Sequence, residues 1–320
     1  MTEQKQEKTT HPFWVMVQKE MSDQIRSWRF LILLAIIVLT CIGSIYGALN
    51  NIRQAVSDDS DFIFLKLFTT SDGTLPSFFT FVNFLGPLLG IGLGFDAINS
   101  ERNKGTLSRI MSQPIHRDSV LNAKFTASII VIAILFFSLS FLVMGMGLIT
   151  LGIPPTPQEF WRVVFYTLVS IFYVAFWLNL SILFSVRFRQ PATSALSGIA
   201  VWLFFSVFYG MILNLIARAI APSGQTTVDE YIRFQELMLG LQRLSPSTLF
   251  GEATTTLLMP SVPTLGFLTQ EQAYRYIPSP LPISQSLILV WPQLTGMVAA
   301  TLICFAVSYV LFMRQEIRSR

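Results

Sequence analysis

Six long runs of mostly apolar residues alternate with shorter polar segments along this chain. Each run reaches the length of roughly 20 residues that a helix needs to cross the hydrocarbon core of a bilayer. We therefore predict an all-α polytopic membrane protein. Its six spans are Phe30–Leu49, Ser77–Ile98, Phe125–Leu151, Val163–Val186, Thr193–Ala217 and Gln285–Met313. An even number of spans places both termini on the same side of the membrane.

The segment before the first span, Pro12–Trp28, has the pattern of an amphipathic helix. Its apolar positions lie within one arc of the helix, and its basic and polar residues lie opposite. These apolar positions are Phe13, Trp14, Val17, Met21, Ile25 and Trp28. A helix with an aromatic face and a basic face is typical of the membrane interface, where we expect it to lie flat. The alternative is a core helix of a small soluble cap, which would have few other soluble residues to pack against.

A second, shorter helix is predicted in the loop between the second and third spans, residues 99–124. Its signals are Gly105 and Thr106 as start and cap, Leu107, Ile110 and Met111 on one face, and Pro114 as stop. From this pattern alone, two interpretations are equally open. The helix could receive force from a partner beside the membrane, or the segment could be an ordinary loop that orients the protein.

The segment Arg218–Ser284, between the fifth and sixth spans, is too long for a simple connector. Thr227 and Glu230 form a capping-box pattern that opens one helix, and a second amphipathic helix is predicted at about Thr248–Leu258. We expect either a small external cap or a pair of re-entrant helices.

Most of the 22 Lys and Arg residues lie in the N-terminal segment, the loops after the second and fourth spans, and the C-terminal tail. The positive-inside rule places these segments in the cytoplasm. The chain then divides into a cytoplasmic segment (1–29), spans one to five (30–217), an external segment (218–284), and the last span with its tail (285–320). We expect a multi-pass protein of the plasma (inner) membrane with both termini in the cytoplasm.

The composition also restricts the chemistry of the chain, which is 52% hydrophobic and 12% charged. Soluble domains typically contain about 25% charged residues. Cys41 and Cys304 lie in apolar runs and the two histidines lie on different segments, so we expect no metal site and no catalytic residues. No Gly-Lys dipeptide occurs, so the chain has no Walker A loop for nucleotide phosphates. Basic loops of a membrane protein explain the pI near 9.2 better than nucleic-acid binding does.

Two patterns in and beside the second span concern packing. Gly86, Gly90 and Gly94 recur every four residues, a spacing that lets another helix approach closely. That helix could belong to the same chain or to a second protomer. Asp96 lies at the edge of the span close to Glu101, which favours a structural ion pair over proton chemistry.

The order of four stretches is similar to one known family. These stretches are Lys19–Phe30, Phe95–Arg102, Gly105–Arg117 and Leu244–Ala253. Together they resemble the membrane subunit of ABC type-2 transporters, close to the permeases associated with copper-enzyme maturation. The similarity covers nearly the whole chain, and Glu101–Arg117 is its most specific part. Nothing in the chain identifies a copper site, so the substrate of that group is not carried over.

The resemblance implies a dimer with an identical or related permease and a separate cytosolic ATPase beneath each copy. ATP and Mg would bind to that ATPase, and this chain would bind no cofactor. Pro12–Trp28 would be an elbow helix, and export is the implied direction. The coupling helix that docks on the ATPase would involve Glu101, Arg102, Gly105, Thr106, Leu107, Ile110, Met111, Pro114 and Arg117.

Two other classes of membrane protein remain as alternatives. A stand-alone secondary transporter would have charged residues near the bilayer midplane and inverted repeats. Here Asp96 lies at the edge of a span, and no clear repeat is visible. A membrane enzyme would gather polar catalytic groups at one interface, whereas His11 and His116 lie on different segments. Recovery of a soluble ATPase with the purified protein would separate the ABC interpretation from both.

Overall fold

The computed structural model describes residues 12–55, 62–71, 76–112, 116–152, 154–221, 228–260 and 280–315. Every regular element within these ranges is a helix. Six helical stretches are long and apolar enough to cross a membrane, which confirms the predicted fold class. They are Trp28–Leu49 within α2 (Trp28–Ala55), Phe78–Asn103 beginning with α4 (Phe78–Gly94), α7 (Arg117–Leu151), α8 (Pro157–Arg187), α9 (Pro191–Leu203) with η1 (Phe204–Phe208) and α10 (Tyr209–Ile220), and α14 (Ile283–Arg314).

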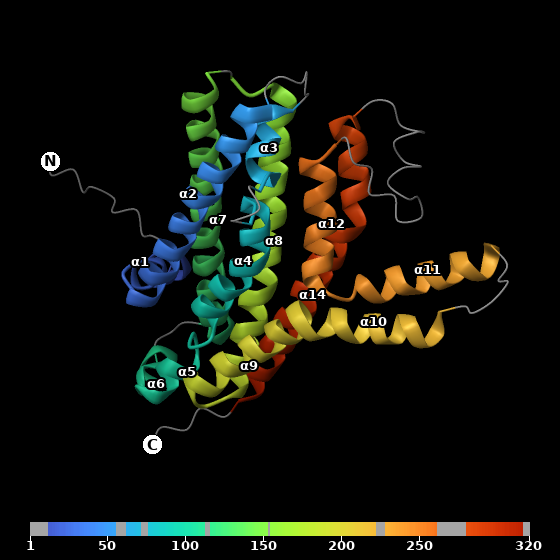
Figure 1. Ribbon diagram of the computed structural model, residues 1–320. Coiled ribbons are helices and arrows are strands. Elements are labelled where there is room, and N and C mark those ends of the chain that lie inside the picture. Colours follow the sequence, from blue (N-terminus) through green and yellow to red (C-terminus); the bar gives the residue numbers. More distant parts are fainter. Residues whose placement is uncertain are drawn as a thin grey trace, which may run out of the picture.

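Shorter helices lie around these spans. They are α1 (Pro12–Ile25), α3 (Ile63–Thr69), α5 (Asn99–Asn103), α6 (Thr106–Met111), α11 (Val228–Gln242) and α12 (Pro246–Leu258). Figure 1 shows α2, α4, α7 and α8 as a bundle, with α3 at one end and α5 and α6 at the other. The helices α10 and α11 project sideways from the bundle as neighbours.

The centre of the bundle is α8, which packs against α4, α7, α12 and α14. Its side chains Tyr173 and Trp177 are fully buried. The glycine pattern of α4 faces this helix: a Cβ at Gly90 would lie 2.7 Å from the Val174 carbonyl oxygen, and one at Gly94 would lie 2.7 Å from that of Leu178. The neighbour at these glycines is therefore a helix of the same chain.

The amphipathic helix α1 ends three residues before the predicted end at Trp28. The Ser27 hydroxyl accepts a hydrogen bond from the Phe30 N–H at 3.2 Å and so caps α2, which places Trp28 in the first span. The predicted apolar face also divides in two. Phe13, Val17 and Met21 pack with Ala123 and Ala127 of α7, whereas Trp14, Ile25 and Trp28 are exposed.

The helix α12, in the segment between the fifth and sixth spans, lies along α8 and α14, whereas α11 of the same segment contacts α10. The two alternatives for this segment, an external cap and a pair of re-entrant helices, both stay predictions. Phe250 of α12 stacks on Tyr173, halfway along α8, with ring centroids 4.4 Å apart. Near the start of α8, the buried Arg162 donates hydrogen bonds to the Leu257 carbonyl at 3.0 Å and the Ser286 hydroxyl at 3.1 Å. The helix α11 begins at Val228, and the predicted cap Thr227 lies outside the described residues.

The short helix α3 was not predicted from the sequence. Its apolar residues Phe64, Leu65, Leu67 and Phe68 are buried in the bundle. The carboxylate of Glu159, itself buried in the first turn of α8, accepts a hydrogen bond from the Phe64 N–H at 2.9 Å. The helix α3 has only seven residues. An isolated helix of this length is unstable in water, so α3 depends on these tertiary contacts.

Candidate coupling site

The helix α6 begins at Thr106, as the sequence predicted, after a sharp turn at Gly105. Gly105 has a φ of +70°, in the left-handed region that favours glycine. The Thr106 hydroxyl donates to the Glu101 carbonyl at 3.2 Å and so ties the helix back to α5. The helix ends at Met111, and the predicted stop Pro114 lies outside the described residues, as do the side chains of Ile110 and Met111.

Leu107 faces the protein's own interior. Its side chain is only 2% exposed and belongs to the main hydrophobic core. Around it, Lys104 and Arg109 are exposed, as is Gly105 at the turn. Leu107 therefore anchors α6 to the bundle, and the described outer surface of this region is basic.

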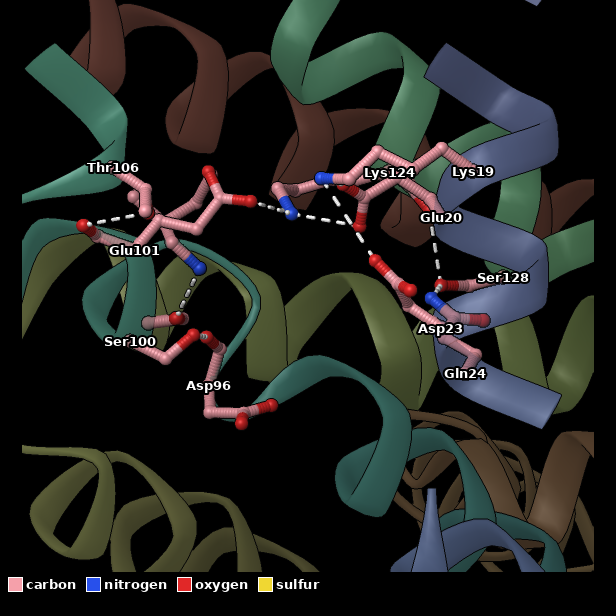
Figure 2. Close-up of polar contacts among 12 residues, drawn as sticks. Lys19, Glu20, Asp23, Gln24, Asp96, Ser100, Glu101, Thr106, Lys124 and Ser128 are labelled. Atoms are coloured by element: carbon pink, nitrogen blue, oxygen red, sulfur yellow. Dashed lines mark hydrogen bonds and ion pairs between the residues drawn. The ribbon is translucent and has the colours of Figure 1, made fainter. Parts of the chain in front are cut away.

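An ion-pair triad of Lys124, Glu20 and Glu101 joins α7, α1 and α5. The Lys124 ammonium lies 2.8 Å from a Glu20 carboxylate oxygen and 2.7 Å from one of Glu101. The three side chains are only 7%, 14% and 13% exposed. Figure 2 shows Lys124 between acidic side chains of α1 and the carboxylate of Glu101. Because water screens this triad poorly, it holds the three helices together more firmly than a surface ion pair would.

Further polar contacts join α1 to α7 and α2 to α4. The Gln24 amide donates to the Ser128 hydroxyl at 2.6 Å. The Arg29 guanidinium lies 2.6 Å from the Asp96 carboxylate, so Asp96 does form an ion pair, with a partner at the start of the first span. Together with the triad, these contacts fix the position of α1 beside the link from α4 to α6.

The end of α14 also belongs to this site, through Gln315. Its side-chain oxygen accepts a hydrogen bond from Arg102, its backbone carbonyl accepts one from Arg117, and its amide donates to the Val186 carbonyl at 2.6 Å. Arg117 also lies over the Phe312 ring, 5.5 Å from its centroid. Arg102 and Arg117, predicted as coupling residues, therefore contact the chain's own C-terminal region.

The turn from α4 into α5 is held by a residue of α8. The Ser185 hydroxyl accepts hydrogen bonds from the N–H groups of Ile98 at 2.9 Å and Asn99 at 3.2 Å. These two donors lie at the start of α5, where backbone N–H groups have no partner within the helix. Sequence reasoning missed Ser185 and Gln315, because both lie far along the chain from the helix that they support.

Charged side chains surround a cavity of about 310 Å³ between α1, α4, α5 and α7. Its acidic and basic residues balance: Glu20, Asp23, Asp96 and Glu101 against Lys19, Arg29, Lys104 and Lys124. Among the described residues, no three His, Cys, Asp or Glu side chains are grouped to hold a metal ion. The helices α1, α4, α7, α8 and α14 thus meet at α5 and α6 through these contacts.

Comparison with known proteins gives the family. The sequence model of the ABC-2 family transporter proteins matches residues 14–317. The chain is also similar to "Probable ABC transporter permease protein NosY" of Stutzerimonas stutzeri, with 23% identity over 244 residues, 74% of this chain and 79% of that protein. A protein of the same name from Pseudomonas aeruginosa is 23% identical over 209 residues, 63% of this chain and 70% of that protein. The chain therefore belongs to the ABC-2 family of transporter proteins, as the resemblance in its sequence implied.

Proposed function

We propose that this ABC transporter permease forms a translocation path as a dimer, with an identical or related second permease, and exports its substrate. A separate ATPase subunit, which binds ATP and Mg, docks on the surface around α6 from the cytoplasm and drives the cycle. The permeases named NosY lend support to the assignment as a permease subunit. Their names give no substrate, and none is proposed on that basis.

The observation that carries this proposal is the way α6 is joined to the bundle. Leu107 inserts α6 into the core, and Glu101 of the preceding helix α5 binds Lys124 of α7. A partner that pushes on the exposed surface at Lys104 and Arg109 would therefore move α4, α1 and α7 together. An unattached loop would absorb such a push without passing it on.

The cytoplasmic orientation can be tested with one cysteine added to a chain in which Cys41 and Cys304 are replaced by serine. Ser112 follows α6 and is exposed, so Ser112→Cys places a thiol beside the proposed docking surface. We expect a membrane-impermeant maleimide to label this thiol only after the cells are permeabilised. The same variant without permeabilisation is the control, and labelling in intact cells would place α6 outside and exclude a cytosolic ATPase at this surface.

Coupling itself is tested at Gly105. Gly105→Pro cannot keep a φ of +70°, because the proline ring fixes φ near −65°. The turn into α6 should therefore be redirected. With the cognate ATPase co-expressed and reconstituted, we expect transport-linked ATP turnover to fall by about tenfold, the effect of losing a coupling free energy of about 1.4 kcal/mol.

Gly152 provides a matched control for this variant. It also has a positive φ, of +71°. Its N–H donates to the Leu148 carbonyl, and the N–H of Gly105 likewise donates to the Arg102 carbonyl. Gly152 lies at the other end of α7, away from α6. Gly152→Pro should therefore cause similar local damage and leave ATP turnover nearly intact. Equal turnover in both variants would contradict a coupling role for α6.

A further inference from the structure

A second cavity, of about 490 Å³, lies between α10, α11 and the start of α12. It is separate from the coupling site and belongs to the pair of helices that projects from the bundle (Figure 1). The Tyr209 hydroxyl of α10 donates to the Leu241 carbonyl of α11 at 2.5 Å, which ties the two walls together. The cavity is therefore part of the folded arrangement of these helices.

The lining of this cavity is uncharged, although α11 itself carries several charges. Among the described residues, no Asp, Glu, Lys, Arg or His lines the cavity. The helix α11 directs toward it Phe234, Gln235, Met238 and Gln242, which share one face. Its charged residues Asp229, Glu230, Arg233 and Glu236 are exposed and lie outside the lining. An ionic ligand would find no opposite charge here to offset the loss of its hydration.

The lining combines hydrogen-bonding groups with apolar surface. Ser206, Asn214, Gln235, Gln242, Ser247 and Thr248 supply hydroxyl and amide groups. Phe205, Leu213, Phe234 and Met238 supply the apolar part. Uncharged polar side chains form more than half of this lining and apolar side chains most of the rest, so the cavity suits a ligand that has both kinds of surface. The wall also includes part of the π-helical segment Phe204–Phe208, a type of distortion frequent at functional sites.

We propose that this cavity binds a neutral amphiphile, an uncharged molecule with hydroxyl or amide groups on an apolar body. Because α10 belongs to a stretch that can span the membrane, the bilayer is the nearest source of such a ligand. It is then either the carried molecule or a resident lipid. The role as carried molecule rests on the proposed function, whereas binding itself does not.

Gly210 offers a way to fill the cavity without disturbing the fold. It lines the cavity, and a Cβ built on it meets no atom of the described residues within 4 Å. Gly210→Leu therefore places a side chain in the space that the ligand would occupy. Gly240 of α11 also has no described atom within 4 Å of a built Cβ, but it is not part of the lining. Gly240→Leu is thus the matched control.

The experiment uses the full chain in nanodiscs, without an ATPase, and two diazirine-bearing probes: diacylglycerol, which is neutral, and phosphatidylglycerol, which is anionic. Adducts are mapped by mass spectrometry. We expect the neutral probe to label peptides of α10 and α11 in the wild-type protein. Labelling should fall about tenfold in Gly210→Leu and stay at the wild-type level in Gly240→Leu. The anionic probe should label these peptides weakly in all three proteins. Equal labelling by both probes, or undiminished labelling of Gly210→Leu, would overturn the proposal.

A second arm separates the two sources of the ligand. Stimulation of ATP turnover by the neutral diacylglycerol probe, in the complex with the ATPase, would identify a carried molecule. Labelling without stimulation would identify a resident lipid, and either result supports a site for neutral amphiphiles. A failure of ATPase coupling would leave the labelling unchanged, so it is distinguishable from a failure of this proposal.

Discussion

Replacing Lys124 with methionine should lower the free energy of unfolding by about 3–5 kcal/mol, the usual effect of removing one partner from a buried ion pair. The variant leaves the carboxylates of Glu20 and Glu101 facing each other, only 14% and 13% exposed. Glu101 loses its described ion-pair partner, and Glu20 keeps only Lys19, whose ammonium lies 3.6 Å away. Thermal unfolding of the purified permease in a fixed detergent measures the effect as a lower midpoint.

Two further variants make this prediction specific. Lys19→Met removes an exposed lysine that lies 3.6 Å from Glu20 and 3.8 Å from Asp23, and such long, exposed pairs should contribute no more than about 1 kcal/mol. Combining Lys124→Met with Glu20→Met and Glu101→Met replaces the whole triad with apolar side chains and should restore most of the stability. If Lys124→Met unfolds like Lys19→Met, the triad does not hold the helices together.

The all-methionine variant also separates stability from coupling. It keeps α1, α5 and α7 packed. Its apolar contacts are not directional, however, so they fix the relative position of these helices less strictly than charge-assisted hydrogen bonds do. We therefore expect ATP turnover in the reconstituted complex to remain low even where the unfolding midpoint has recovered.

The sequence predicted the six spans because their apolar runs are long, but it placed several helix ends too far inward. The third span was predicted from Phe125, whereas α7 begins at Arg117. Hydropathy marks the part that crosses the hydrocarbon core, and the helix continues beyond it through polar residues. Asp118 in its first turn suits the positive end of the helix dipole. Lys124, counted from the sequence as part of a loop, consequently lies inside a helix.

The candidate site was predicted less completely, because a periodic pattern gives the face of a helix and not its partner. The pattern around Leu107 fits an ATPase-facing surface and a bundle-facing surface equally well, and the structure places this side chain in the core. Similarly, Arg102 and Arg117 have the composition of an exposed basic loop. Their contacts with Gln315 join residues about 200 positions apart, which no local signal reports.

The α4–α8 contact is where the smallest substitution should have a large effect. A Cβ at Gly90 would lie 2.7 Å from the Val174 carbonyl oxygen and 2.8 Å from the Leu178 nitrogen. Both are backbone atoms of a helix and cannot rotate aside, so Gly90→Ala must push α4 and α8 apart. We expect the free energy of unfolding to fall by about 1–3 kcal/mol, as when a packed core is overfilled, and the thermal midpoint to fall with it.

Gly145 of α7 is the matched control, since a Cβ there meets no described atom within 4 Å. Gly145→Ala should leave the midpoint unchanged or raise it slightly, because alanine favours the helix over glycine by about 1 kcal/mol. Equal midpoints for the two variants would mean that α4 and α8 can separate freely. That result would also weaken one part of the proposed route of force. The helix α4 leads directly into α5 and α6, and it passes a motion of α6 to the centre of the bundle only if α4 and α8 move as one.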